Sequence, residues 1–172
     1  FWGRKLLDVL TFLPHAMPSI VIGLALIYVY LTLDFIPIYA TRWIILVAFV
    51  TRYIAFGTRT MNAGILQVHR ELEEAAQVSG ASWGTILLKI IVPLLLPTMI
   101  GVSIWVAAHV MRELSMALML NSPGNMIISQ IIWAYWDNGN TPETCALGVM
   151  LIFALLIITF IGRKIGSQYE VH

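Results

Sequence analysis

Four long apolar stretches alternate with shorter polar connections along this chain. A membrane-spanning α-helix needs roughly 20 mostly apolar residues. The pattern therefore predicts an all-α, polytopic transmembrane helix bundle with about four spans, at residues 12–33, 43–61, 90–120 and 144–161. Two prolines fall inside the first stretch and two open the third, and such breaks are tolerated where neighbouring helices satisfy the backbone.

The connection between the third and fourth stretches, residues 121–143, carries turn signals at both ends. They are "NSPGN" and "DNGNTPE", which combine Asn, Gly and Pro. Between them, "MIISQIIWAYW" (126–136) is apolar and rich in the Trp and Tyr that favour membrane interfaces. This segment is predicted to form a short helix or a re-entrant piece.

One polar connection, "ELEEAAQVSGASWGTILLKIIVP" (71–93), breaks the apolar pattern with glutamates and small residues. Glu, Leu, Ala and Gln are good helix formers, and acidic residues suit a helix N-terminus, so residues 71–79 are predicted to be helical. Gly80 is placed to end this helix in the left-handed conformation. A second helical run should begin at Trp83. One small, shallow face of the first helix is formed by Leu72, Ala75, Ala76 and Ser79.

Composition supports a membrane protein. Of the 172 residues, 59% are hydrophobic and 11% charged, with a mean hydropathy of +0.86, whereas soluble domains are about 25% charged. The net charge of +1 comes without a basic tract, so no nucleic-acid partner is predicted. The single cysteine, Cys145, excludes an internal disulfide framework.

The distribution of Lys and Arg predicts the orientation. If residues 71–93 are cytoplasmic, seven of the ten basic residues lie inside and one, Arg42, lies outside, as the positive-inside rule requires. The other two, Arg52 and Arg112, fall within predicted spans. Both ends of the chain are then cytoplasmic. The seven are Arg4, Lys5, Arg59, Arg70, Lys89, Arg163 and Lys164.

The acidic helix has two interpretations on physical grounds. It is either a connecting loop with an amphipathic turn at the lipid surface or a docking element for a protein. Helices that lie on membranes usually carry Lys and Arg on their polar face, and this one carries glutamates. That difference favours a protein partner with basic groups.

The same stretch resembles the EAA loop of ABC importer permeases. The pattern Glu74-Ala75-Ala76, three residues, Gly80, nine residues, Ile90, one residue, then Val92-Pro93 matches the family pattern, with Val92 in place of leucine. "LPHAMPSIVIGLAL", "TRYIAFGTRTMNAGILQVHRELEEAAQVSGAS" and "MRELSMALMLNSPGN" resemble the second half of iron(III)-type permeases, so the likeness covers nearly the whole chain.

This resemblance implies a MetI-like permease core of the bacterial inner membrane. Residues 1–172 would be one transmembrane domain lacking its first helix and an N-terminal half-permease, and 62–92 its cytoplasmic coupling loop. It also implies separate ABC ATPase subunits, a periplasmic or lipid-anchored substrate-binding protein, a second half-permease and surrounding membrane lipid. The implied seating residues are Glu74, Ala75, Ala76 and Gly80, with Leu72 and Ser79 on the same helix. Ferric iron is the favoured cargo, and thiamine, phosphonate, polyamine and sulfate are alternatives.

ATP chemistry is not predicted in this chain because it contains no G-x-x-x-x-G-K-[ST] loop. ATP and Mg²⁺ would belong to the partner ATPase, and no cofactor is expected here. An intramembrane enzyme is a remote alternative, since "HVMRE" lacks the second His of a zinc-protease motif.

Four polar residues within spans are costly in lipid and mark either structure or function. They are Arg52, His109, Arg112 and Glu113. Three interpretations remain: an ion pair of Arg52 or Arg112 with Glu113, a polar patch on the translocation path, or a metal or catalytic site. A permanent tight metal site would oppose release of a transported ion, so no bound metal is expected.

Overall fold

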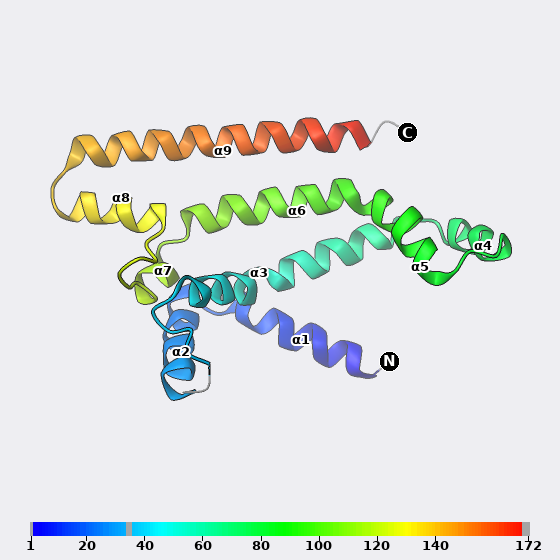
Figure 1. The fold of residues 1–172 in the computed structure, drawn as a ribbon, viewed down its shortest axis with the longest axis horizontal. Helices are drawn as coiled ribbons and strands as arrows, with labels where there is room; N and C mark the ends of the chain where they lie inside the picture. The colour runs from blue at the N-terminus through cyan, green and yellow to red at the C-terminus, as the bar shows by residue number, and fades with distance from the viewer. Residues whose placement is uncertain (1, 34–35, 170–172) are drawn as a thin grey trace. The chain divides into compact units, whose positions relative to one another are not determined.

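The computed structural model describes residues 2–33 and 36–169. Within these ranges the fold is all-α, as predicted, and contains no strand (Figure 1). The helices run in chain order as α1 Trp2–Ala16, α2 Ser19–Thr32, α3 Arg42–Ile65, α4 Arg70–Val78, α5 Trp83–Ile86, the π-helix η1 Leu87–Ile91, α6 Val92–Arg112, α7 Ser115–Met119, α8 Ile128–Asp137 and α9 Thr141–Tyr169.

Three continuous helical stretches in the described part are long and apolar enough to cross a membrane: Arg42–Ile65, Trp83–Arg112 and Thr141–Gly166. A fourth candidate is a bent pair, Val9–Ala16 with Ser19–Thr32. The number of spans therefore agrees with the predicted four if the bent pair counts as one.

The first predicted span, 12–33, is not one straight helix, and this corrects the sequence interpretation. Its two parts meet at an angle of 112°. Pro18 is extended, with φ −57° and ψ 137°. The helix is interrupted here because a proline has no N–H to donate and disfavours helical geometry in the residue before it. Pro14 lies inside α1 and does not end it.

The third predicted span, 90–120, also needs correction at both ends. The continuous stretch begins at Trp83 and ends at Arg112, and residues 115–119 form the separate helix α7. Near its start the backbone widens into η1, where Val92 N–H donates to the Leu87 carbonyl five residues earlier. The π-turn stands directly before Pro93, which cannot donate to the preceding turn.

The chain divides into two compact units. One comprises Phe1–Phe56 with Val106–Leu156, and the other Gly57–Trp105 with Ile157–His172. In the first unit α2 packs against α7, and a Cβ on Gly23 would lie 3.0 Å from Met119 Cβ. This close approach needs a residue without a side chain, as at other packed membrane helices.

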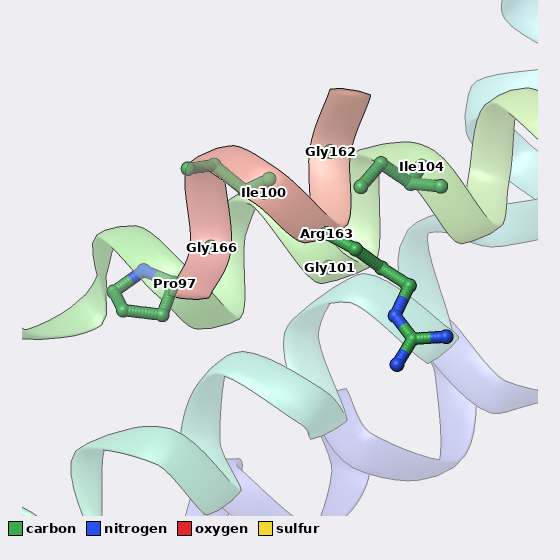
Figure 2. A pocket seen from close by; sticks show the side chains of 7 residues that line it. All are labelled: Pro97, Ile100, Gly101, Ile104, Gly162, Arg163 and Gly166. Carbon is green, nitrogen blue, oxygen red and sulfur yellow. The ribbon is translucent and has the colours of Figure 1, made fainter. Parts of the chain in front are cut away.

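The second unit contains α4, α5, η1 and the adjoining parts of α3, α6 and α9. Gly64 of α3 faces Leu95 and Thr98 of α6, where an added Cβ would lie 3.1 and 3.2 Å from their side chains. Gly162 of α9 packs directly on Ile104 of α6 (Figure 2). Small residues thus bring both α3 and α9 close to α6 within this unit.

Candidate functional site

The predicted acidic helix is present as α4, which begins at Arg70 after the N-cap His69 and ends at Val78. Its C-terminus forms a Schellman motif. Gly80 adopts a φ of +81°, its N–H donates to the Gln77 carbonyl (2.9 Å), and Ala81 N–H donates to the Ala76 carbonyl (3.0 Å). Gly80 therefore ends the helix as the sequence predicted.

A second cap follows at once and starts the next helix. The Ser82 side chain accepts a hydrogen bond from Thr85 N–H at 3.4 Å, so α5 begins at Trp83 as expected. From there α5, η1 and α6 run on as one stretch. Helix α4 is thus joined to a candidate membrane span by only four residues, 79–82.

Helix α4 packs on a small apolar cluster. Ile86, Ile91 and Leu95, each at most 6% exposed, form its centre on α5, η1 and α6. Ala76 and Ala81 pack on this centre, as do Met61 and Val68 from the end of α3 and the segment after it. These contacts connect α4 to the start of the stretch that continues into α6.

The remaining face of α4 is open. Leu72 is 46% exposed and Val78 is 90% exposed, and Ala75 and Ser79 are exposed beside them. Trp83, just after the turn, is 65% exposed. The structure thus separates the motif residues: Ala76 packs on the cluster of its own unit, whereas Glu74 and Ala75 face outward.

Val78 and Trp83 were not among the predicted site residues. Val78 follows Ala75 by three positions, so the helical spacing used for the other residues could have identified it. A hollow of about 480 Å³ lies beside this open face, between the end of α3 and α4, and Glu73, Glu74 and Gln77 line it with Ile65, Leu66 and Val68. We call the exposed Leu72, Glu74, Ala75, Val78 and Ser79 the α4 outer face.

The polar residues within the spans do not form one cluster of ion pairs. Arg52 Nη1 donates to the carbonyl oxygens of Pro14 (2.8 Å), His15 (3.0 Å) and Met17. His15 Nδ1 lies 3.4 Å from the Arg52 carbonyl oxygen. Arg52 therefore fastens α3 to the C-terminal end of α1, where unpaired carbonyls carry partial negative charge.

Glu113 is bound to its own loop. Its Oε1 accepts from Met116 N–H at 3.3 Å, and its carbonyl oxygen accepts from Ser129 Oγ at 2.8 Å. Its carboxylate makes no ion pair with Arg52 or Arg112 within the described ranges. The ion pair considered from the sequence is therefore absent there, and Glu113 serves instead to start α7.

The other two polar residues of the set are His109 and Arg112. The ring of His109 meets Tyr53 edge-on, with centroids 6.2 Å apart. Arg112 lines a groove with Trp133 and Trp136 of α8. Among the described residues no three His, Cys, Asp or Glu side chains gather as a metal site would require.

The match to a family model covers residues 1–165, and the family is the binding-protein-dependent transport system inner membrane component. The chain belongs to this family. Such a chain resides in a membrane, and the apolar helices Arg42–Ile65, Trp83–Arg112 and Thr141–Gly166 supply several candidate passes.

Relatives differ in the substrates that their names give. PhnV of Salmonella paratyphi A, named for 2-aminoethylphosphonate transport, is 26% identical over 169 residues, covering 96% of this chain and 63% of that protein. The Fe(3+)-transport system permease protein FbpB 2 of Haemophilus influenzae is 26% identical over 160 residues, covering 92% and 31%. This chain thus spans less than two thirds of each relative.

Solved structures show the same fold. A bacterial ABC transporter involved in import of the acidic polysaccharide alginate superposes with a TM-score of 0.78 at 17% identity, over 96% of this chain and 66% of the other. The MetNI methionine ABC transporter gives 0.76 at 18% identity, over 96% and 75%. The MetI-like helical fold expected from the sequence is confirmed.

Proposed function

We propose that this chain forms part of the permease of an ATP-driven, binding-protein-dependent importer and couples to a separate ATPase through α4. The observation that supports this most is the two-sided character of α4. Ala76 packs on the cluster at the base of α6, while the α4 outer face stays exposed with apolar side chains at Leu72 and Val78. Exposed apolar surface of this kind is typical of a protein contact site.

The proposed mechanism is mechanical. A partner ATPase that closes on ATP would carry α4 with it, and the packing of Ala76 and Ala81 on Ile86 would pass that displacement to the stretch Trp83–Arg112. Rigid-body movement of packed elements is a known way of switching between states. ATP and Mg²⁺ would be bound by the ATPase, and this chain would be neither an enzyme nor a cofactor carrier.

The proposed cellular arrangement follows from charge. The protein would lie in the bacterial inner membrane with α4 and both ends of the chain on the cytoplasmic side. A periplasmic or lipid-anchored binding protein would deliver the cargo from the other side, and a second half-permease would complete the path. Seven of the ten basic residues then lie inside, which supports this orientation.

Ferric iron is the proposed cargo, and 2-aminoethylphosphonate is the second candidate. Support for iron comes from relatives named for Fe(3+) or ferric transport at 26% and 29% identity. Support for the phosphonate comes from four PhnV proteins at 26–27% identity. The α4 outer face concerns coupling to the ATPase and carries no information about the identity of the cargo.

The test uses the full-length permease with its ATPase in liposomes. ATP hydrolysis is recorded after adding binding protein that is empty, loaded with Fe³⁺ or loaded with 2-aminoethylphosphonate. Stimulation by the iron-loaded form alone supports iron, and stimulation by the phosphonate form alone supports the second candidate. Failure of the ATPase to copurify with the permease would contradict the importer itself.

The coupling helix is tested by Ala75→Trp, on the exposed face, and Ala76→Trp, on the packed face. Both should lower transport per ATP hydrolysed, because the first obstructs docking and the second lifts α4 off its cluster. Ala146→Trp, an exposed alanine of α9, is the matched control and should keep wild-type coupling. Full transport in both α4 variants would refute the assignment.

A further inference from the structure

The buried side chains at the base of α6 follow a spacing that an α-helix cannot place on one face. Ile86, Ile91 and Leu95, which form the centre of the cluster next to α4, are five and then four positions apart. In an uninterrupted α-helix each residue turns the chain by about 100°, so positions four apart share a face and positions five apart do not. The spacing alone would therefore put Ile91 on a different side of the helix from Ile86.

The π-helix η1 corrects this mismatch. Val92 N–H donates to the carbonyl of Leu87, five positions back, so the turn holds one residue more than an α-turn. The extra residue brings Ile91 into line with Ile86, and both are buried, whereas Leu88 is 68% exposed. The π-turn thus sets the rotational position of the start of α6 against the cluster on which α4 packs.

A second register lies one residue away. Ile90 comes four positions after Ile86, and it already packs against the same cluster while remaining only partly buried. If η1 relaxed to an α-turn, Val92 N–H would donate to Leu88 and Ile90 would share the face of Ile86. Pro93 has no N–H and donates in neither arrangement, so it favours neither register.

We propose that η1 is a register switch between α4 and α6. In the structure the π-turn is formed and Ile91 is the buried member of the pair. Displacement of α4 releases the π-turn, and the start of α6 turns by about 100°, so that Ile90 takes the place of Ile91. The switch rests on the proposed coupling of α4 to an ATPase, and it names the element that converts a displacement of α4 into rotation of the candidate span Trp83–Arg112. π-turns inside α-helices are frequent at functional sites.

Single-residue deletions in the full-length permease with its ATPase test the register. Deleting Leu88 removes the extra residue, so Ile86, Ile91 and Leu95 become four positions apart and keep their packing in a plain α-helix. The thermal midpoint should then equal that of wild type. Deleting Met99, an exposed residue of α6 beyond η1, is the matched control and should lower the midpoint by about 4 °C or more, because all later positions of the stretch lose their register. Equal losses for the two deletions would overturn this role of η1.

Thiol labelling tests the switch itself. Ile91→Cys and Ile90→Cys are each combined with Cys145→Ser, and maleimide labelling in nanodiscs is compared without nucleotide and with ATP plus vanadate. An alternate state is populated to about 10% or less at rest, so ATP plus vanadate should speed labelling of Ile91→Cys by about tenfold or more. Labelling of Ile90→Cys should become slower. After deletion of Leu88 only one register exists, and neither cysteine should respond to nucleotide.

The outcomes separate the switch from the importer assignment. Labelling of Ile91→Cys that ignores nucleotide, in a complex that hydrolyses ATP, would overturn the switch and leave the importer assignment intact. A permease that copurifies with no ATPase would contradict both.

Discussion

Replacing Gly162 by alanine tests how closely α9 approaches α6 in the second unit. An added Cβ would overlap the Ile104 side chain, with Cγ1 only 2.6 Å away. Gly166 lies one helical turn further along α9 and lines the same hollow, yet an added Cβ there has nothing within 4 Å (Figure 2). The two glycines therefore make a matched pair on one helix.

The expected effects have opposite signs. Helix propensity alone favours each Gly→Ala change by about 1 kcal/mol. At Gly162 the forced overlap adds a cost of about 1–3 kcal/mol, because the Ile104 side chain must change position to make room for the new Cβ. Gly166→Ala should therefore be neutral or stabilising, and Gly162→Ala should be less stable than Gly166→Ala by about 1–3 kcal/mol.

The assay is thermal unfolding of the full-length permease with its ATPase in one detergent, followed by tryptophan fluorescence. Combining Gly162→Ala with Ile104→Ala removes the atoms that clash. The double variant should then be more stable than the two single effects predict, with a coupling of about 0.5–3 kcal/mol. Equal midpoints for Gly162→Ala and Gly166→Ala, or simple additivity with Ile104→Ala, would refute this packing.

Three other predictions concern backbone geometry and polar contacts. Gly80→Ala, at a φ of +81°, should cost about 1–2 kcal/mol and speed hydrogen exchange at the end of α4, and unchanged exchange would contradict it. Arg52→Gln should lower the unfolding free energy by about 3 kcal/mol, and Arg52→Lys by less, because lysine keeps a charge that can donate to carbonyls; equal losses in chemical unfolding would contradict that role. Gln130 is 1% exposed and donates to the Ala117 carbonyl at 2.6 Å, so Gln130→Leu should lower the unfolding free energy by about 2–4 kcal/mol. Asn138→Ala, at an exposed position, should lower it little, and similar thermal midpoints for the two variants would contradict this role of Gln130.

The parts predicted well from sequence are those set by neighbouring residues. Helix α4, its termination at Gly80 and the restart at Trp83 all follow from propensity, a glycine and a serine cap within a few positions. The helix within residues 126–136 follows likewise and is α8. Local chemistry decides these features, so a single sequence is sufficient to find them.

The parts predicted poorly depend on distant residues. A proline shows that a helix can break, but the angle of 112° at Pro18 is fixed by contacts such as Arg52 with the carbonyls of α1, nearly 40 residues away. The end of α6 at Arg112 is followed by Glu113, whose carbonyl oxygen accepts a hydrogen bond from the distant Ser129 Oγ. Charge alone suggested an ion pair for Arg52 and could not reveal its backbone partners.

The way in which α4 is joined to the next helix determines whether it can transmit a displacement. Along the chain, α4 is joined to α5 only by the four-residue turn 79–82. A rigid turn of this length would pass on a displacement of α4, whereas a loose turn would dissipate it. The Schellman bonds of Gly80 and Ala81 and the Ser82 cap hold this turn, and Ala76 and Ala81 pack on the cluster at the base of α6. The small residues therefore serve two surfaces at once. They let α4 lie close to its own cluster, and they leave the α4 outer face shallow enough for a partner to reach. A bulky residue at Ala75 or at Ala76 should therefore uncouple transport from ATP hydrolysis, each through a different set of contacts.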